Sequence, residues 1–150
     1  MEISNRSIHS SVKTIGDDHL QVSSFLLDLA HSLNLELTVR ISSRMIESAT
    51  ASMSKVPLTR CFSALESFAR LEGLTISRGI IKKMRSRIGG PKGCAHLMEL
   101  LEDAVRLVSS ILIVESVGYR SKPNGILTEE ETIARGMEKL RNTCLVFADE

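Results

Sequence analysis

The residues best suited to chemistry in this sequence are a thiol and an imidazole that stand two positions apart, Cys94 and His96. They follow a glycine-rich loop that begins at Gly89, and they open a long apolar segment with helical spacing. A cysteine in the first turn of a helix lies near the positive end of the helix dipole, which favours a thiolate. The pattern therefore indicates a site at the start of this helix.

One interpretation makes Cys94 the nucleophile of a thiol-dependent enzyme, with His96 as the base that activates it. Inside a regular helix, two residues two positions apart point in different directions. The pair can therefore converge only if Cys94 lies at or before the helix cap. A buried cysteine without chemistry is the other interpretation, because free cysteine is among the most buried residue types. The sequence leaves the question of enzymatic activity open.

A second interpretation is a site for a transition-metal ion. The predicted ligands are Cys61, Cys94, His96 and Cys144, with His31 as a further candidate. The sequence has no Cys-x-x-Cys pair of the kind that holds structural zinc. Asp28 and His31 lie three residues apart, and on one strand they would point to opposite faces of the sheet.

A third interpretation places a small ligand in the loop itself, because glycine N–H groups before a helix start suit a phosphate or carboxylate. The predicted ligand-binding residues are Gly90, Lys92, Gly93, Cys94 and His96. The loop is not a P-loop, since neither Ser nor Thr follows Lys92. We interpret the basic residues before the loop as the solvated face of the preceding helix.

The elements that position these residues follow from hydrophobic periodicity. The segment at about 94–117 carries apolar residues at steps of three and four, and from Ala104 it becomes apolar nearly all round, which predicts a buried central helix ending near Gly118. Polar residues interrupt it too often for a membrane span. Three further helices are expected at about 57–73, 77–88 and 128–144. In the first and last of these, Cys61 and Cys144 fall on apolar stripes.

The N-terminal third predicts strands. Alternating polarity indicates strands at 8–15, 35–41 and 45–53. The segment 19–31 fits a strand with a bulge near Ser23 and Ser24, although a helix from Ser24 also explains part of it. Three to four consecutive strands with short turns predict an antiparallel meander, packed against the four helices. The expected fold class is therefore α+β, in a single domain over 1–150.

Composition narrows the function classes. The net charge of +1 and an aromatic content of 3% argue against nucleic-acid binding. The polar N-terminus has no apolar signal core, and three cysteines are too few for a disulfide framework. We therefore expect a cytoplasmic protein with no membrane partner, whose partner is an unidentified small ligand or another protein.

The residues around the central loop also resemble a known family. The run Gly93-Cys94-Ala95-His96-Leu97 is similar to the Gly-Cys-Thr-His-Leu box of a bacterial domain of unknown function, number two thousand eight hundred and eighty-nine. The likeness covers roughly 8–148, and this chain departs from it at Ala95 and at Leu145, where the family often has a histidine. The resemblance implies no established activity.

A looser likeness is to iron–sulfur scaffold proteins, whose cysteines would correspond here to Cys61, Cys94 and Cys144, although Phe62 interrupts the scaffold's Cys-Gly-Asp motif. The sequence thus favours a non-catalytic domain that binds a small ligand or a transition-metal ion at the Cys94–His96 loop. The alternatives are a thiol enzyme, an iron–sulfur scaffold and a structural or partner-binding module.

Overall fold

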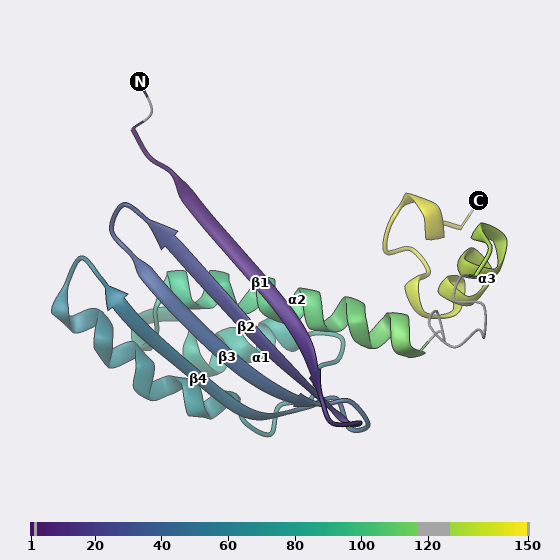
Figure 1. The fold of residues 1–150 in the computed structure, drawn as a ribbon, viewed down its shortest axis with the longest axis horizontal. Helices are drawn as coiled ribbons and strands as arrows, with labels where there is room; N and C mark the ends of the chain where they lie inside the picture. The colour runs from purple at the N-terminus through teal and green to yellow at the C-terminus, as the bar shows by residue number, and fades with distance from the viewer. Residues whose placement is uncertain (2, 117–126, 150) are drawn as a thin grey trace. The chain divides into compact units, whose positions relative to one another are not determined.

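The computed structural model describes residues 1, 3–116 and 127–149, apart from the side chain of Lys92 (Figure 1). The chain divides into two compact units, Met1–Ser109 and Ser110–Glu150. Each unit is described by itself below. The expected helix end near Gly118 and the loop after it lie outside the described residues.

The first unit begins with a four-stranded antiparallel sheet in which each strand pairs with the next along the chain. The strands are β1 (Arg6–Ile15), β2 (His19–Asp28), β3 (Ser32–Arg40) and β4 (Met45–Lys55). The meander predicted from the alternating polarity is confirmed, and 19–28 is a strand rather than a helix. With the helices that follow, the fold is α+β.

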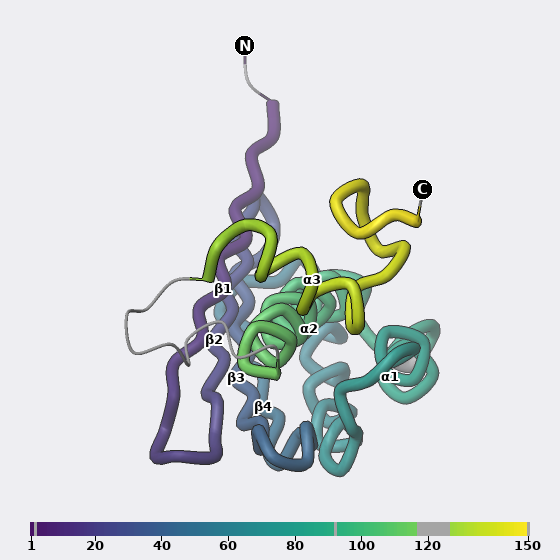
Figure 2. The backbone as a smooth tube through the Cα atoms, turned by 90° about the vertical axis from the view of Figure 1, so that its right-hand side faces the viewer, coloured from purple at the N-terminus to yellow at the C-terminus, as the bar shows by residue number. Residues whose placement is uncertain are grey.

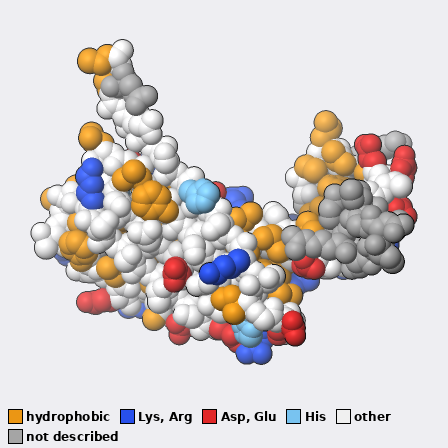
Figure 3. All heavy atoms as spheres, in the orientation of Figure 1, with side chains coloured by type: hydrophobic (Ala, Val, Ile, Leu, Met, Phe, Trp, Pro, Cys, Tyr) orange, Lys and Arg blue, Asp and Glu red, His pale blue; other side chains and the backbone are white. Residues whose placement is uncertain are grey.

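The bulge expected in β2 near Ser23 and Ser24 is absent. The register of β2 with β1 and with β3 is continuous. Ser24 points inward with the apolar even-numbered residues and is buried. Its hydroxyl tolerates burial because it forms a hydrogen bond with the hydroxyl of Ser10 on β1, 2.7 Å away. Phe25 and Leu27 therefore lie on the outer face. Figure 3 shows this face as mostly polar, with scattered hydrophobic side chains.

Helices of the first unit lie on one side of the sheet (Figure 2). They are the 3₁₀ helices η1 (Thr59–Leu71) and η2 (Gly90–Lys92), the α-helix α1 (Ile80–Ile88), and the part of α2 (Ala95–Ser116) that runs to Ser109. The apolar stripe predicted for the first helix is wrong in phase. The buried residues of η1 are Ala64, Ser67, Phe68 and Leu71, which form a stripe on another face of the helix, while Phe62 is 42% exposed. Cys61 is only half-buried.

Helix α2 supplies much of the core of the first unit. Its buried residues there include Leu97, Leu100, Leu101, Ala104, Val105 and Val108. Burial nearly all round is not found, because Leu107, Ile113 and Val114 are only half-buried. Among the described residues, no helix combines the length and the apolar character needed to cross a bilayer.

The second unit contains α3 (Glu129–Leu140) and the short 3₁₀ helix η3 (Leu145–Phe147). The capping box expected at Thr128 is confirmed, since its hydroxyl accepts from the Glu131 N–H and the Glu131 carboxylate accepts from the Thr128 N–H. Cys144 is not on the inward stripe of a helix as predicted. The helix ends at Leu140, and Cys144 is an exposed residue just before η3.

Candidate functional site

The glycine loop between α1 and α2 makes a tight connection that the other amino acids would not fit. A Cβ added at Gly93 would come within 1.7 Å of the Ile88 carbonyl oxygen, and one at Gly89 within 2.6 Å of the Arg85 carbonyl oxygen. Gly90 has a φ of +67°, in the left-handed region that favours glycine. These glycines therefore hold a close approach between the end of α1 and the start of α2.

A cavity of about 440 Å³ opens beside this loop. It is lined by Arg85, Gly89, Gly90, Cys94, Ala95, Met98, Glu99 and Glu102. Cys94 lies immediately before the first residue of α2, and its carbonyl accepts the N–H of Met98. It therefore occupies the cap, the position from which its thiol can lie on the cavity wall beside the apolar side chains of Ala95 and Met98.

Two carboxylates of α2 give the cavity its polar side. Glu102 accepts hydrogen bonds from Nε and Nη2 of Arg85, both at 2.6 Å, and this raises the pKa of Arg85. Glu99 accepts a 2.8 Å bond from Arg6, which lies on β1. In each carboxylate, one of the two oxygens accepts hydrogen bonds from an arginine. Among the described side chains that line the cavity, Arg85 is the one basic group, against the two acidic groups of Glu99 and Glu102.

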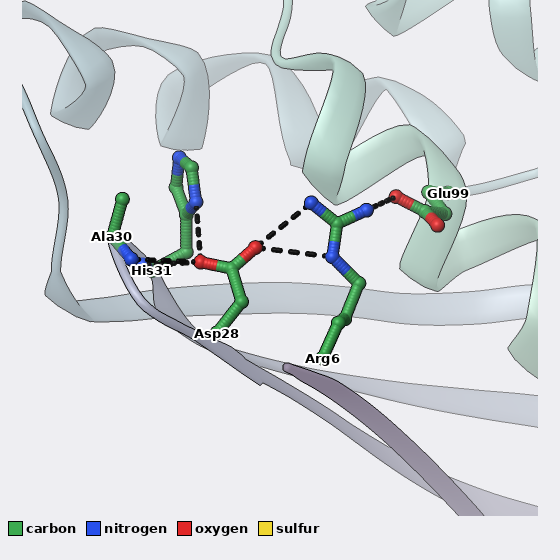
Figure 4. Close-up of polar contacts among 5 residues, drawn as sticks. All are labelled: Arg6, Asp28, Ala30, His31 and Glu99. Atoms are coloured by element: carbon green, nitrogen blue, oxygen red, sulfur yellow. Dashed lines mark hydrogen bonds and ion pairs between the residues drawn. The ribbon is translucent and has the colours of Figure 1, made fainter. Parts of the chain in front are cut away.

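A second feature lies where β2 turns into β3 (Figure 4). The carboxylate oxygen Oδ1 of Asp28 accepts the backbone N–H groups of Ala30 and His31, at 2.9 and 2.8 Å. It also lies 2.9 Å from Nδ1 of His31. The strand ends at Asp28, so the expectation that the two residues point to opposite faces is wrong. A tight turn, rather than a strand, brings them together.

The other oxygen of Asp28 is held by Arg6, whose Nε and Nη2 donate to Oδ2 at 3.0 and 2.8 Å. Burial by itself would raise the pKa of Asp28, but the hydrogen bonds from Ala30, His31 and Arg6 outweigh it and hold that pKa well below its usual range. Asp28 is therefore ionised at neutral pH, and an ionised carboxylate only accepts. The hydrogen between the two groups is therefore on Nδ1 of His31.

The first turn of α2 adds a third side chain to this turn. The rings of His31 and His96 lie with centroids 3.8 Å apart and planes 34° apart. Burial lowers the pKa of His96, and the nearby His31 and Arg6 act in the same direction. One ligand atom from each of Asp28, His31 and His96 lies within 4.8 Å of the other two. We call these three residues the His–Asp cluster.

The residues predicted to form one site therefore lie in several different places in the structure. Gly90 and Cys94 line the cavity, Gly93 shapes the loop, and His96 belongs to the His–Asp cluster; the side chain of Lys92 lies outside the described atoms. Cys61 is on η1, and Cys144 is in the other unit. Within the described ranges, the cluster is the one group of three or more metal-capable side chains, and it includes none of the cysteines.

Sequence reasoning missed Asp28 and His31 as partners. The available signal was an aspartate followed three residues later by a histidine, Asp28 and His31, between two strands. An aspartate in that position often accepts backbone N–H groups two and three residues later, which closes a turn. A reading of 19–31 as one strand hid this possibility. The contact with His96 has no local signal, because it depends on how α2 packs on the sheet.

A protein-family model described as "Protein of unknown function (DUF2889)" matches residues 9–108, which is most of the chain. The chain belongs to this family. The description of DUF2889 names no activity, as the resemblance of the central box implied. No curated protein and no solved structure matches the chain. The matched residues contain the whole His–Asp cluster and all the residues that line the cavity, whereas Arg6 lies before the matched segment.

Proposed function

We propose that this DUF2889 chain is a small-molecule-binding domain whose ligand occupies the cavity between α1 and α2. The observation that supports it best is the cavity of about 440 Å³ itself. Sites for small molecules have volumes of roughly 300–1,000 Å³ and combine an apolar wall with a few polar groups. Cys94, Ala95 and Met98 supply such a wall, and the glycine loop holds its edge in place.

The lining also favours one class of ligand. The second oxygen of Glu99 and that of Glu102 accept no hydrogen bond from the described residues. Carboxylate oxygens only accept, so a group that meets them must be a donor. The proposed ligand is a small organic molecule with an apolar body and an N–H or O–H group. The excess of acidic over basic groups among the described lining side chains weighs against the phosphate or carboxylate that the glycine loop alone would favour.

Binding is better supported than thiol catalysis. A thiol nucleophile is normally accompanied by a base within hydrogen-bond reach. Among the described residues, the thiol of Cys94 makes no hydrogen bond, and the ring of His96 stacks on His31. The small net charge supports a ligand other than nucleic acid. Three free thiols support a reducing, cytoplasmic location, which is part of this proposal.

The test is a ligand-detected NMR screen of a fragment library against the full chain, in the presence of a chelator. Ala95→Trp would fill the cavity from its α2 wall, and Ser48→Trp would place the same ring on the outer face of β4, where Ser48 is exposed. We expect fragments that bind the unmodified chain to lose binding in Ala95→Trp and to keep it in Ser48→Trp. A screen without hits, or hits that bind both variants equally, would refute the proposal.

A further inference from the structure

We propose that the His–Asp cluster binds one divalent transition-metal ion of the class that includes Zn²⁺ and Co²⁺. The inference is independent of the cavity, because it depends on a different set of side chains. Asp28 and His31 come from the turn between β2 and β3, and His96 comes from the first turn of α2. An ion at this point would join the sheet to the helix that forms one wall of the cavity.

The spacing of the donor atoms is the first support. One ligand atom from each residue lies within 4.8 Å of the other two. In a tetrahedral zinc site with metal–ligand bonds of about 2.0–2.2 Å, ligand atoms are separated by roughly 3.3–3.6 Å. The three donors are therefore close to a ligand set without a metal, and small rotations of the side chains would bring them onto a common ion.

The orientation of His31 is the second support. In zinc proteins, a metal-binding histidine commonly gives its other ring N–H to a carboxylate or carbonyl, which fixes the tautomer and the direction of the ring. Here Nδ1 of His31 lies 2.9 Å from Oδ1 of Asp28, so the same kind of contact fixes the direction of this ring. His31 is also buried, and its side chain is 11% exposed, which limits the other orientations that the ring can adopt.

Oδ2 of Asp28 is held by Arg6, and Arg6 also has a second carboxylate partner, Glu99. Arg6 donates to Oδ2 of Asp28 and also to Glu99 at 2.8 Å. If Oδ2 turned toward the ion, the guanidinium would retain its bond to Glu99. Asp28 would then supply negative charge to the ion while Arg6 stayed anchored to α2.

The donor types define the class of metal. Two imidazoles and one carboxylate suit zinc, cobalt, nickel or copper, whereas magnesium and calcium prefer oxygen ligands throughout. Three protein ligands leave one position of a tetrahedral site for water or another donor. The ligand set also differs from the one predicted from the sequence: it keeps His96 and the further candidate His31, adds Asp28 and contains none of the cysteines.

The experiment is a Co²⁺ titration of the untagged, chelator-treated full chain, followed by visible absorption and calorimetry. We expect one Co²⁺ per chain and a loss of affinity of at least about tenfold in His96→Gln, since removing a ligand or its support typically costs 10–100-fold. His31→Gln should have the same effect. Because His31 is buried, circular dichroism must show that His31→Gln folds. If it does not fold, the Co²⁺ affinity of His96→Gln decides the test, because His96 is only half-buried.

The matched control is His19→Gln. Nε2 of His19 lies 2.9 Å from a carboxylate oxygen of Glu47, so it is also a histidine–carboxylate pair, but it belongs to no group of three donors within the described residues. The affinity of the His19→Gln variant for Co²⁺ should equal that of the unmodified chain. Equal losses in all three histidine variants, absence of stoichiometric binding, or displacement of Co²⁺ by an equal concentration of Mg²⁺ would overturn the proposal.

Cys94→Ser separates this site from the cysteine-based one. Cobalt bound by thiolate has an intense near-ultraviolet charge-transfer band, which nitrogen and oxygen ligands do not produce. We expect no such band, and we expect Cys94→Ser to bind Co²⁺ as the unmodified chain does. A thiolate band that disappears in Cys94→Ser, together with full binding by His31→Gln, would assign the ion to the cysteines and refute the His–Asp cluster.

Discussion

The imidazole of His96 in the first turn of α2 lies against the imidazole of His31 in the β2–β3 turn, with ring centroids 3.8 Å apart. This contact joins a helix to a sheet at the point where Asp28 and Arg6 also meet. Arg6 bonds to both Asp28 on β2 and Glu99 on α2, and Ser10 of β1 donates to Asp103 of α2 at 2.5 Å. Polar contacts therefore fix the start of α2 on the sheet beside its apolar core.

The low pKa of Asp28 predicts a dependence of stability on pH. A carboxyl whose pKa is lower in the folded than in the unfolded state stabilises the fold above the unfolded value, about 3.9. That contribution disappears as the pH falls through the folded value. Asp28→Asn should therefore be less stable than the unmodified chain at pH 7. The difference should shrink between about pH 5 and pH 2, as measured by urea unfolding of metal-free protein.

Arg40→Gln provides a comparison, because Arg40 bonds to Glu47 and lowers the pKa of that carboxyl, but does so away from the His–Asp cluster. Its effect should also decrease in acid. If the loss of stability in Asp28→Asn stayed constant from pH 7 to pH 3, the hydrogen bonds to Asp28 would not favour the ionised form as described.

The glycine loop predicts two substitutions of unequal cost. In Gly93→Ala the new Cβ would lie 1.7 Å from the Ile88 carbonyl oxygen, so the backbone must move, and we expect a loss of about 3 kcal/mol in the free energy of unfolding. Gly90→Ala meets no atom within 4 Å and has only its positive φ against it, about 1–2 kcal/mol. Urea denaturation measures both, and a larger loss for Gly90→Ala would contradict the loop geometry.

In the second unit, Gly136 predicts a coupling with Phe147. A Cβ at Gly136 would come within 2.4 Å of the Phe147 ring, whereas alanine in a helix is otherwise favoured over glycine by about 1 kcal/mol. Gly136→Ala should therefore stabilise a Phe147→Ala background by about that amount, and should stabilise the unmodified chain less or destabilise it. A double-mutant cycle measured by thermal unfolding tests this. Additive effects would mean that the ring does not cover Gly136.

The cysteines should differ in their rates of alkylation. Cys144 is exposed, whereas Cys61 and Cys94 are half-buried, so access should govern the order of modification. We expect iodoacetamide to modify Cys144 first in the folded protein, with peptide mass spectrometry identifying the site at each time. In urea the three rates should become similar. Fastest modification of Cys94 would instead support the thiol-enzyme interpretation.

The order of strands and helices could be predicted because it depends on local patterns. Alternating polarity around Leu35 and Leu37, and the steps of three and four after Leu97, report which face of each element is removed from water. The capping box at Thr128 is equally local. The errors occurred where the apolar stripe was assigned to the wrong face of a helix, as in η1, or where a buried serine such as Ser24 interrupted the apolar run while its hydroxyl found a partner on the neighbouring strand.

For the candidate site too, the sequence predicted the part that depends on residues close in sequence and not the part that depends on tertiary contacts. The cavity edge could be anticipated from the glycines and Cys94, which are neighbours in sequence. The His–Asp cluster could not, because periodicity contains no information on which turn of the sheet faces which turn of a helix. Only packing brings His96 to His31, and only the turn after β2 directs Asp28 toward both. Local propensities thus account for the elements, and the tertiary contacts account for the chemistry between them.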